Sequence, residues 1–176
     1  MAVHPIRMYG DPVLREKCRP VEEITPEIHT LVEDLIDSMI DASGIGLAAP
    51  QIGETVRVFV IDLSATEEGH KPMAFINPEI LSTEGEQNGD EGCLSFPDYF
   101  DKVVRAERVT ATAIGLDGEP FEVEGTGIMA RVLLHETDHL NGVLFIDRMS
   151  KFRLRLAQGR LRKLKRGTEE ALKEEG

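Results

Sequence analysis

Residues 127–142 read GIMARVLLHETDHLNG, and this stretch decides how the rest of the chain has to pack. At about 100° per residue on a helix, one face carries a mixed set of side chains: Ile128, Arg131, Val132, His135 and His139. Leucines and a methionine occupy the other sides, so the helix would be apolar around most of its circumference. Such a helix is expected to be buried, and its histidines and acids then need partners.

The same stretch contains an HExxH motif at residues 135–139. On a helix, His135 and His139 project one turn apart on one side, a spacing that chelates a single metal ion. Glu136 lies about 60 to 100° around the helix from them, close enough to contact a metal-bound water and act as general base and then acid. The alternative is a pair of core histidines whose rings are satisfied by backbone carbonyls.

A catalytic metal site needs a third protein ligand. A metzincin would place a histidine at position 145, which is Phe145 here, and the first acid beyond Asp147 is Glu169, far away in the tail. Cys93, in the sequence EGCLSFP at residues 91–97, can supply the missing ligand. Taken alone, Cys93 would instead be interpreted as a small buried hydrophobe.

A third motif, GIGLAAPQ, occupies residues 44–51. Its glycines and alanines let the backbone approach a ligand closely, and Gln51 offers an amide donor. It is not a dinucleotide-binding fingerprint, because it follows a predicted helix and the GxGxxG pattern is incomplete. Taken alone, it would be a helix end followed by a buried loop.

The sequence before this motif predicts a second helix. Thr25-Pro26-Glu27 provides an N-cap, a proline at the first helical position and an acid in the first turn. Apolar residues recur at helical spacing from there to Ile40, and Gly44 supplies the stop. This helix is expected to pack one face on the core.

The remaining elements are predicted to be strands. They lie at residues 57–63, at residues 73–81 with an interruption at Asn77-Pro78, and from Val103 to a turn at Asp117-Gly118 that leads into residues 121–124 as a hairpin. Helices do not alternate with these strands, so the pattern does not favour a doubly wound parallel sheet. We expect an α+β fold in which antiparallel β-sheets pack around the central buried HExxH helix, with a C-terminal helix.

Length and composition are those of an ordinary globular protein. The chain has 176 residues, of which 41% are hydrophobic and 30% charged, so residues 1–150 are expected to form one catalytic domain. No apolar run exceeds four residues, which predicts no membrane span and no signal peptide, and hence a cytoplasmic location. Only Cys18 and Cys93 are present, too few for a disulfide framework.

Charge is segregated along the chain. Residues 1–150 hold 11 Lys and Arg against 28 Asp and Glu, whereas residues 151–167 hold eight Lys and Arg and no acid. The acidic body should repel nucleic acid, so no DNA partner is expected. Residues 151–176 are predicted to form a basic helical tail, interrupted by Gly159, and only this tail suggests contact with RNA.

The three motifs together, in this order, resemble peptide deformylase, whose family motifs have the forms GxGLAAxQ, EGCLS and HExDH. The resemblance extends over roughly residues 5–150. It implies that Cys93, His135 and His139 bind one divalent metal ion, Fe²⁺ in the cell, with Ni²⁺, Co²⁺ or Zn²⁺ possible in preparations. The implied substrate is the N-formyl-methionine end of a nascent polypeptide, and the products are formate and a free amino terminus.

The resemblance also assigns roles in the reaction. Metal-bound water attacks the formyl carbon, and Glu136 accepts the proton of the water and later delivers it to the leaving amine. Gln51 and the backbone N–H of Leu94 correspond to the oxyanion donors of the family. Rival interpretations are a metalloprotease that cleaves internal peptide bonds and a non-enzymatic protein that binds metal or peptide.

The resemblance further places the substrate. Gly44, Ile45 and Gly46 would pair with its backbone as an added strand, and Ile128 and Val132 would line the methionine pocket. Arg131 departs from the aliphatic residue of several family members, and we expect its stem to line the pocket while its head reaches solvent. Leu134 replaces a frequent glutamine, with little effect expected on metal binding, since it points away from the ligand face.

Two further expectations concern ion pairs and the tail. Glu91 and Arg105 are expected to form an ion pair that positions the Cys93 loop; the alternative is an exposed surface pair.

In bacterial deformylases a C-terminal helix docks on the ribosome, and residues 151–176 resemble it in position and charge. The alternative is a solvated helix that covers one flank of the domain.

Overall fold

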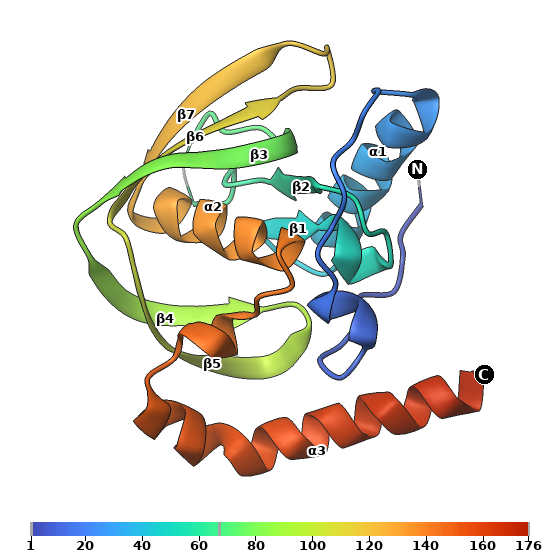
Figure 1. The fold of residues 1–176 in the computed structure, drawn as a ribbon, viewed down its shortest axis with the longest axis vertical. Helices are drawn as coiled ribbons and strands as arrows, with labels where there is room; N and C mark the ends of the chain where they lie inside the picture. The colour runs from blue at the N-terminus through green and yellow to red at the C-terminus, as the bar shows by residue number, and fades with distance from the viewer. Residues whose placement is uncertain (1, 67, 176) are drawn as a thin grey trace.

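A computed structural model describes residues 2–66 and 68–175, and its centre is the helix α2, Gly127–Leu140. Strands β3, β6 and β7 arch over one side of α2, and a two-stranded ribbon lies on the other side (Figure 1). Most residues of α2 are buried, including both histidines of the HExxH motif. The structure therefore confirms the predicted α+β fold with antiparallel sheets around a central buried helix.

The larger sheet has five strands in the order β1-β2-β3-β6-β7, and every pairing is antiparallel. Its strands are β1 (Gly46–Ala48), β2 (Val58–Ile61), β3 (Met73–Glu84), β6 (Arg108–Ile114) and β7 (Pro120–Thr126). The smaller ribbon pairs β4 (Gln87–Cys93) with β5 (Phe96–Arg105). Because β1 lies at the edge of its sheet, one side of it has no neighbouring strand from the residues that the structure describes.

The strand predictions need three corrections. Strand β3 continues through Asn77-Pro78, where the register shifts and Asn77 adopts φ 50°, so these residues form an irregularity within one strand. The run expected from Val103 onward is two strands in different sheets, because the chain turns between Arg105 and Arg108. Strand β4 was not predicted, since its sequence QNGDEGC is rich in residues that disfavour strands. The hairpin that follows, β6 with β7, was predicted correctly.

Helix α1 spans Pro26–Asp41 and begins where the N-terminal signals place it. Its residues Val32, Leu35 and Met39 are buried in a core cluster against β1 and β2. The left-handed residue after the helix is Ser43, with φ 57°, rather than the predicted Gly44. Gly44 packs closely against Leu94: a Cβ on Gly44 would lie 2.7 Å from the end of the Leu94 side chain, which would have to move.

Helix α3, Lys151–Glu175, runs along the outside of the molecule below the β4–β5 ribbon (Figure 1). Contrary to the prediction, Gly159 does not interrupt it. Its buried residues Ala157 and Leu161 share a core cluster with Leu14 and Phe96, so the helix is packed on the body. The described residues also form three short 3-10 helices, η1 (Pro12–Arg15), η2 (Ala49–Ile52) and η3 (Phe145–Arg148). Among the described residues, no helix combines the length and apolar character that crossing a membrane requires.

Candidate active site

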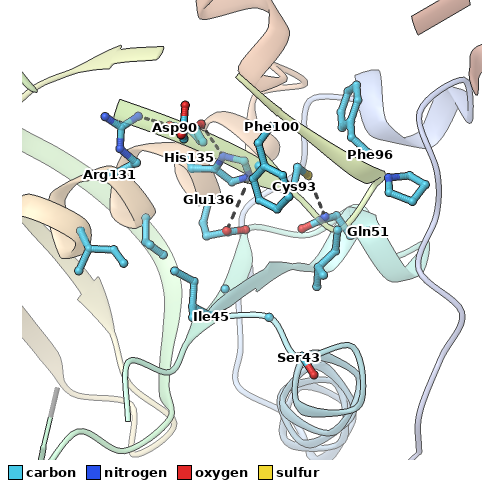
Figure 2. Close-up of a pocket in the computed structure, with 18 of the residues that line it drawn as sticks. Ser43, Ile45, Gln51, Asp90, Cys93, Phe96, Phe100, Arg131, His135 and Glu136 are labelled. Atoms are coloured by element: carbon cyan, nitrogen blue, oxygen red, sulfur yellow. Dashed lines mark hydrogen bonds and ion pairs between the residues drawn. The ribbon is translucent and has the colours of Figure 1, made fainter. Parts of the chain in front are cut away.

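Three side chains with metal-ligand chemistry converge between the ribbon and α2. Cys93 ends β4, and His135 and His139 lie one turn apart on α2. The Nε2 atoms of the two histidines are 3.2 Å apart, and Cys93 Sγ is 3.4 Å from Nε2 of His139. One ligand atom from each residue lies within 4.8 Å of the others. Figure 2 shows Cys93 and His135 at the same wall of a pocket.

This cluster fits a divalent metal ion. One thiol sulfur and two imidazole nitrogens, all bearing lone pairs, face one another at a buried point, and each is a ligand for transition metals. Burial, together with the neighbouring His135, holds the pKa of His139 well below its usual range. The His139 ring is therefore neutral, which is the form that binds a metal.

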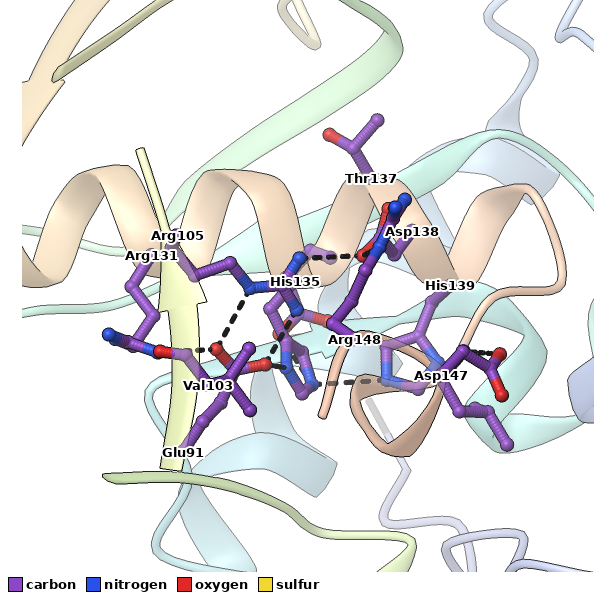
Figure 3. Close-up of polar contacts among 12 residues, drawn as sticks. Glu91, Val103, Arg105, Arg131, His135, Thr137, Asp138, His139, Asp147 and Arg148 are labelled. Carbon is purple, nitrogen blue, oxygen red and sulfur yellow. Dashed lines mark hydrogen bonds and ion pairs between the residues drawn. The ribbon is translucent and has the colours of Figure 1, made fainter. Parts of the chain in front are cut away.

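Glu91 orients the first of these histidines (Figure 3). Nδ1 of His135 lies 2.7 Å from a carboxylate oxygen of Glu91, and this bond leaves Nε2 directed at the cluster. Arg105 donates to both oxygens of Glu91, at 3.0 and 2.7 Å. Burial acts to raise the pKa of Glu91, but the hydrogen bonds from His135 and Arg105 outweigh it and hold the pKa well below its usual range. Glu91 is therefore a buried, ionised acceptor.

Arg105 also links the ribbon to the helix. Its Nη1 donates to Asp138 at 2.7 Å, and Arg148 donates to the same carboxylate at 3.0 and 3.2 Å. The side chain of Arg105 is only 5% exposed, which excludes the alternative of an exposed surface pair with Glu91. Two buried carboxylates, Glu91 on β4 and Asp138 on α2, are thus held by one guanidinium from β5.

The expected position of Arg131 is wrong. Its head does not reach solvent but donates to Glu91 at 2.9 Å and to the carbonyl of Val103 at 3.0 Å, and its side chain is 10% exposed. The buried carboxylate of Glu91 attracts the guanidinium inward. Gly89 leaves space for it, because a Cβ there would lie 3.3 Å from Nη2 of Arg131. The residue thus contributes a cationic wall to the pocket.

Glu136 lies beside the cluster, with one oxygen 4.0 Å from Nε2 of His135. Its other oxygen, Oε1, is buried and has no hydrogen-bond partner in the part of the chain that the structure describes. A Cβ on Gly46 would lie 2.6 Å from Oε2, so only glycine allows β1 to approach the carboxylate this closely. Burial raises the pKa of Glu136 to about 7, although His135 acts in the opposite direction.

Gln51 approaches the cluster from η2. Its side-chain oxygen accepts from the backbone N–H of Ala48 at 3.0 Å, which directs the amide nitrogen away from that strand. The nitrogen donates to Ser95 Oγ at 3.0 Å and lies 3.5 Å from Cys93 Sγ. Leu94 occupies the turn between β4 and β5, directly after Cys93. Both candidate oxyanion donors therefore border the cluster.

The pocket in front of the cluster has a volume of about 610 Å³. It is lined by all the residues predicted to bind substrate, namely Gly44, Ile45, Gly46, Ile128 and Val132. It also contains residues that the sequence did not single out: Ser43, Gln87, Asp90, Phe96 and Phe100. Phe100 is 69% exposed, and its ring lies where a Cβ on Gly92 would be. The aromatic residues on either side of Pro97-Asp98, Phe96 before it and Tyr99-Phe100 after it, were the available sequence signal for this wall.

The fold and the cluster define an HExxH protein of α+β architecture whose third candidate ligand is a cysteine rather than a histidine or glutamate. The family model for polypeptide deformylase matches residues 3–155. A peptide deformylase from Acidobacterium capsulatum is 50% identical over 169 residues, which are 96% of this chain and 99% of the relative. The chain belongs to the polypeptide deformylase family, a family of enzymes that remove N-formyl groups from nascent peptides.

Solved structures agree with this assignment. A peptide deformylase from Legionella pneumophila superposes with a TM-score of 0.85 at 44% identity, covering 94% of this chain and 96% of that one. The deformylase of Synechococcus elongatus, solved in complex with actinonin, has a TM-score of 0.82 at 40% identity, with 87% and 83% covered.

Proposed function

We propose that this chain removes the formyl group from the N-terminal formyl-methionine of newly synthesised polypeptides and releases formate. The observation that carries the proposal is the convergence of Cys93, His135 and His139 at the wall of a pocket, with the buried Glu136 beside them. Membership of the deformylase family supports the reaction type. Because the substrate emerges from the ribosome, we place the enzyme in the cytoplasm.

Cys93, His135 and His139 would hold one divalent metal ion, Fe²⁺ in the cell and Ni²⁺, Co²⁺ or Zn²⁺ in some preparations. When bound, such an ion supplies a Lewis acid that lowers the pKa of water to near neutrality. Glu91 supports this role, since its bond to Nδ1 of His135 fixes the tautomer that leaves Nε2 free to bind.

Glu136 would accept the proton of the attacking water and deliver it to the leaving amine. Its free Oε1 is directed into a buried site, so it has capacity to take a proton without breaking an existing hydrogen bond. A positioned general base of this kind contributes about 10²- to 10⁴-fold to rate. Gly46 holds the backbone of β1 against the other oxygen, which limits how far the carboxylate can move.

Gln51 and the backbone N–H of Leu94 would stabilise the oxyanion. The amide of Gln51 is fixed through Ala48 and Ser95, so its orientation is set before substrate binds. Donors that are preorganised in this way favour the tetrahedral state over the planar amide. Loss of one donor typically costs about 10²- to 10³-fold in rate.

The substrate backbone would add to the sheet beside β1. Gly46 begins this edge strand, and Gly44 and Ile45 lead into it along the pocket. A peptide that pairs with an open edge gains main-chain hydrogen bonds, and alternate side chains enter pockets. Ile128 and Val132 then form the apolar part of the methionine pocket, and Arg131 forms a polar part.

The test is formate release from formyl-Met-Ala-Ser by metal-loaded protein, beside Glu136→Gln with its metal content measured. We expect release by the wild type, and a loss of at least about 10²-fold in the variant with metal retained. Hydrolysis of casein or of unformylated peptide would instead identify a protease. A fully metallated wild type that releases no formate and hydrolyses neither control would favour the non-enzymatic alternative.

We also propose that the cations of α3 contact the ribosome. Exposed Arg155 and Arg166 belong to a segment without acids, which suits an RNA phosphate backbone. Reversing both charges to glutamate should abolish co-sedimentation with ribosomes at low salt while formate release from a free tripeptide is kept. Unchanged co-sedimentation would support the alternative, a solvated helix on the flank.

A further inference from the structure

A second cavity, of about 870 Å³, lies between the N-terminal segment and α3. Residues 4–8 line one side of it, and the C-terminal half of α3, from Arg160 to Glu175, lines the other. Pro97 and Asp98, at the start of β5, line both this groove and the active-site pocket. The two cavities are therefore neighbours that share these two residues as walls, next to the turn that carries Leu94.

Contacts on both sides hold the α3 wall of this groove in place. Arg160 donates to the backbone carbonyl of Asp98, and its guanidinium lies 5.5 Å from the centre of the Tyr99 ring. Farther along the helix, Gly10 adopts φ 111° and approaches α3 so closely that a Cβ there would lie 2.8 Å from the carbonyl oxygen of Lys165. The groove is therefore bounded by a packed helix.

We propose that this groove binds the downstream part of the substrate polypeptide, beyond the residues that occupy the active-site pocket. The inference rests on the proposed deformylase function, in which only the formylated end reacts and the rest of a long chain has to leave the pocket. Pro97 and Asp98 line both cavities, so a chain that leaves the pocket past these two residues would enter the groove.

The dimensions of the groove suit this occupant. From Arg160 to Glu175 the helix rises by about 22 Å at 1.5 Å per residue. An extended chain advances about 3.3 Å per residue, so roughly six or seven residues lie along that length. A substrate of about nine residues would fill both the pocket and the groove.

The lining suits a polypeptide of varied sequence. Apolar side chains, including Ile6, Leu164 and Leu172, share the lining with the cations Arg7 and Lys163 and with the carboxylates of Asp11, Asp98 and Glu175. A surface of such mixed character can accept apolar, acidic and basic side chains without requiring one motif. The family model ends at residue 155, so the helical wall of the groove lies outside the part of the chain that this model matches.

The experiment compares KM for formyl-Met-Ala-Ser with KM for a nine-residue formyl peptide that begins with the same sequence. It uses the metal-loaded wild type, Leu172→Asp in the groove, and Leu156→Asp as the matched control. Leu156 lies on the same helix, is 72% exposed and does not line the groove. Activity on the tripeptide reports that each variant is folded and metallated.

In the wild type we expect KM for the long peptide to be roughly tenfold lower than for the tripeptide, which equals about 1.4 kcal/mol of extra binding. Leu172→Asp should remove this advantage and leave the tripeptide unchanged, while Leu156→Asp should alter neither. Equal KM values for both lengths in the wild type, or equal effects of the two variants, would overturn the inference. Absence of formate from every substrate would instead refute the proposed function itself.

Discussion

At the residue scale, the carboxylate of Glu91 decides the geometry of the site. It accepts hydrogen bonds from His135, Arg105 and Arg131 inside the protein, where unpaired charge is costly. Arg105 in turn neutralises Asp138, so one guanidinium serves two buried acids. The position of a candidate metal ligand thus depends on side chains that would not touch the metal.

Replacing Arg105 with alanine should therefore affect both stability and metal binding. Two buried carboxylates would lose their shared partner, and breaking a buried pair costs about 3–5 kcal/mol. Metal affinity should fall about 10- to 100-fold, because the orientation of His135 is loosened. Urea unfolding and metal competition check these values. Arg108→Ala, which removes an exposed pair with Glu124, is the control and should cost less than about 1 kcal/mol; equal effects of the two variants would contradict the account.

The two thiols should behave differently. Burial raises the pKa of Cys18 to about 11, so at pH 8 it is protonated as well as inaccessible. Cys93 is only partly buried. In metal-free native protein, a disulfide reagent at pH 8 should modify Cys93 and reach Cys18 only after unfolding. Rapid modification of both thiols in the native state would show that the packing around Cys18 is wrong.

The raised pKa of Cys18 also predicts that the free energy of unfolding depends on pH. Because the pKa of Cys18 is higher in the folded state than the usual value near 9, its contribution is fully present below pH 9 and is lost as pH rises through about 11. Cys18→Ala should show a shallower decline of the free energy of unfolding between pH 9 and 11, measured by urea titration. If the free energy of unfolding of Cys18→Ala declined with pH as steeply as that of the wild type, the raised pKa of Cys18 would be contradicted.

The HExxH spacing predicted that the two histidines lie together, and Cys93 was added to them from its motif and the family resemblance, but the surroundings of Arg131 were not predicted. His135 and His139 belong to one helix, so their spacing alone brings them to one side. The location of the Arg131 head depends on Gly89 and Glu91, which lie on a strand that the sequence did not reveal. Contacts between distant segments of this kind do not follow from local periodicity.

At the scale of elements, β1 and α2 meet at a glycine. A Cβ on Gly46 would lie 2.6 Å from Oε2 of Glu136 and 3.1 Å from Val132. Either the strand or the carboxylate has to shift when a side chain is added. The open edge of β1 and the proposed general base are thus positioned by the same contact.

Gly46→Ala should accordingly lower kcat by at least about tenfold, because a displacement of about 1 Å at a catalytic group can cost up to 10²-fold. Metal content should be unchanged, since no ligand contacts Gly46 among its nearest atoms. Gly159→Ala is the control: the added Cβ meets nothing within 4 Å, and it should stabilise α3 by about 0.5–1 kcal/mol without changing kcat. A fully active Gly46→Ala enzyme would count against the proposed contact.

Helices and strands whose own sequence carries strong signals of secondary structure were predicted, and strand β4, which lacks such signals, was not. Helix α1 has a proline at its first position and regular apolar spacing, and α2 is apolar on most sides, so both were found. Strand β4 is polar and glycine-rich, pairs with β5, and is held by the ion pairs that Glu91 forms with Arg105 and Arg131. Its conformation is set by tertiary contacts, which a local pattern does not contain.

At the scale of the whole molecule, α3 is part of the core and also one wall of the groove. Ala157 and Leu161 are buried in the same core cluster as Phe96, the residue that precedes Pro97 and Asp98. The division into a domain of residues 1–150 and a tail of residues 151–176 is still a prediction. The shared cluster indicates that the tail stabilises the body.

Truncation after Ser150 should therefore lower the free energy of unfolding by about 2–4 kcal/mol, from the apolar burial that is lost. A chain that ends at Leu172 is the control and keeps the buried residues of α3. Urea midpoints of the two truncated proteins measure the difference. Equal midpoints would show that residues 1–150 form an independent domain.

One metal ion, held by Cys93, His135 and His139, should be needed for deformylation. The deciding measurement is a titration of anaerobic metal-free protein with Fe²⁺ while formate release from formyl-Met-Ala-Ser is followed. Activity should rise linearly and stop rising at one equivalent per chain, and Cys93→Ala should stay inactive at the same metal concentration. Full activity without metal, or an undiminished rate in Cys93→Ala, would contradict this expectation.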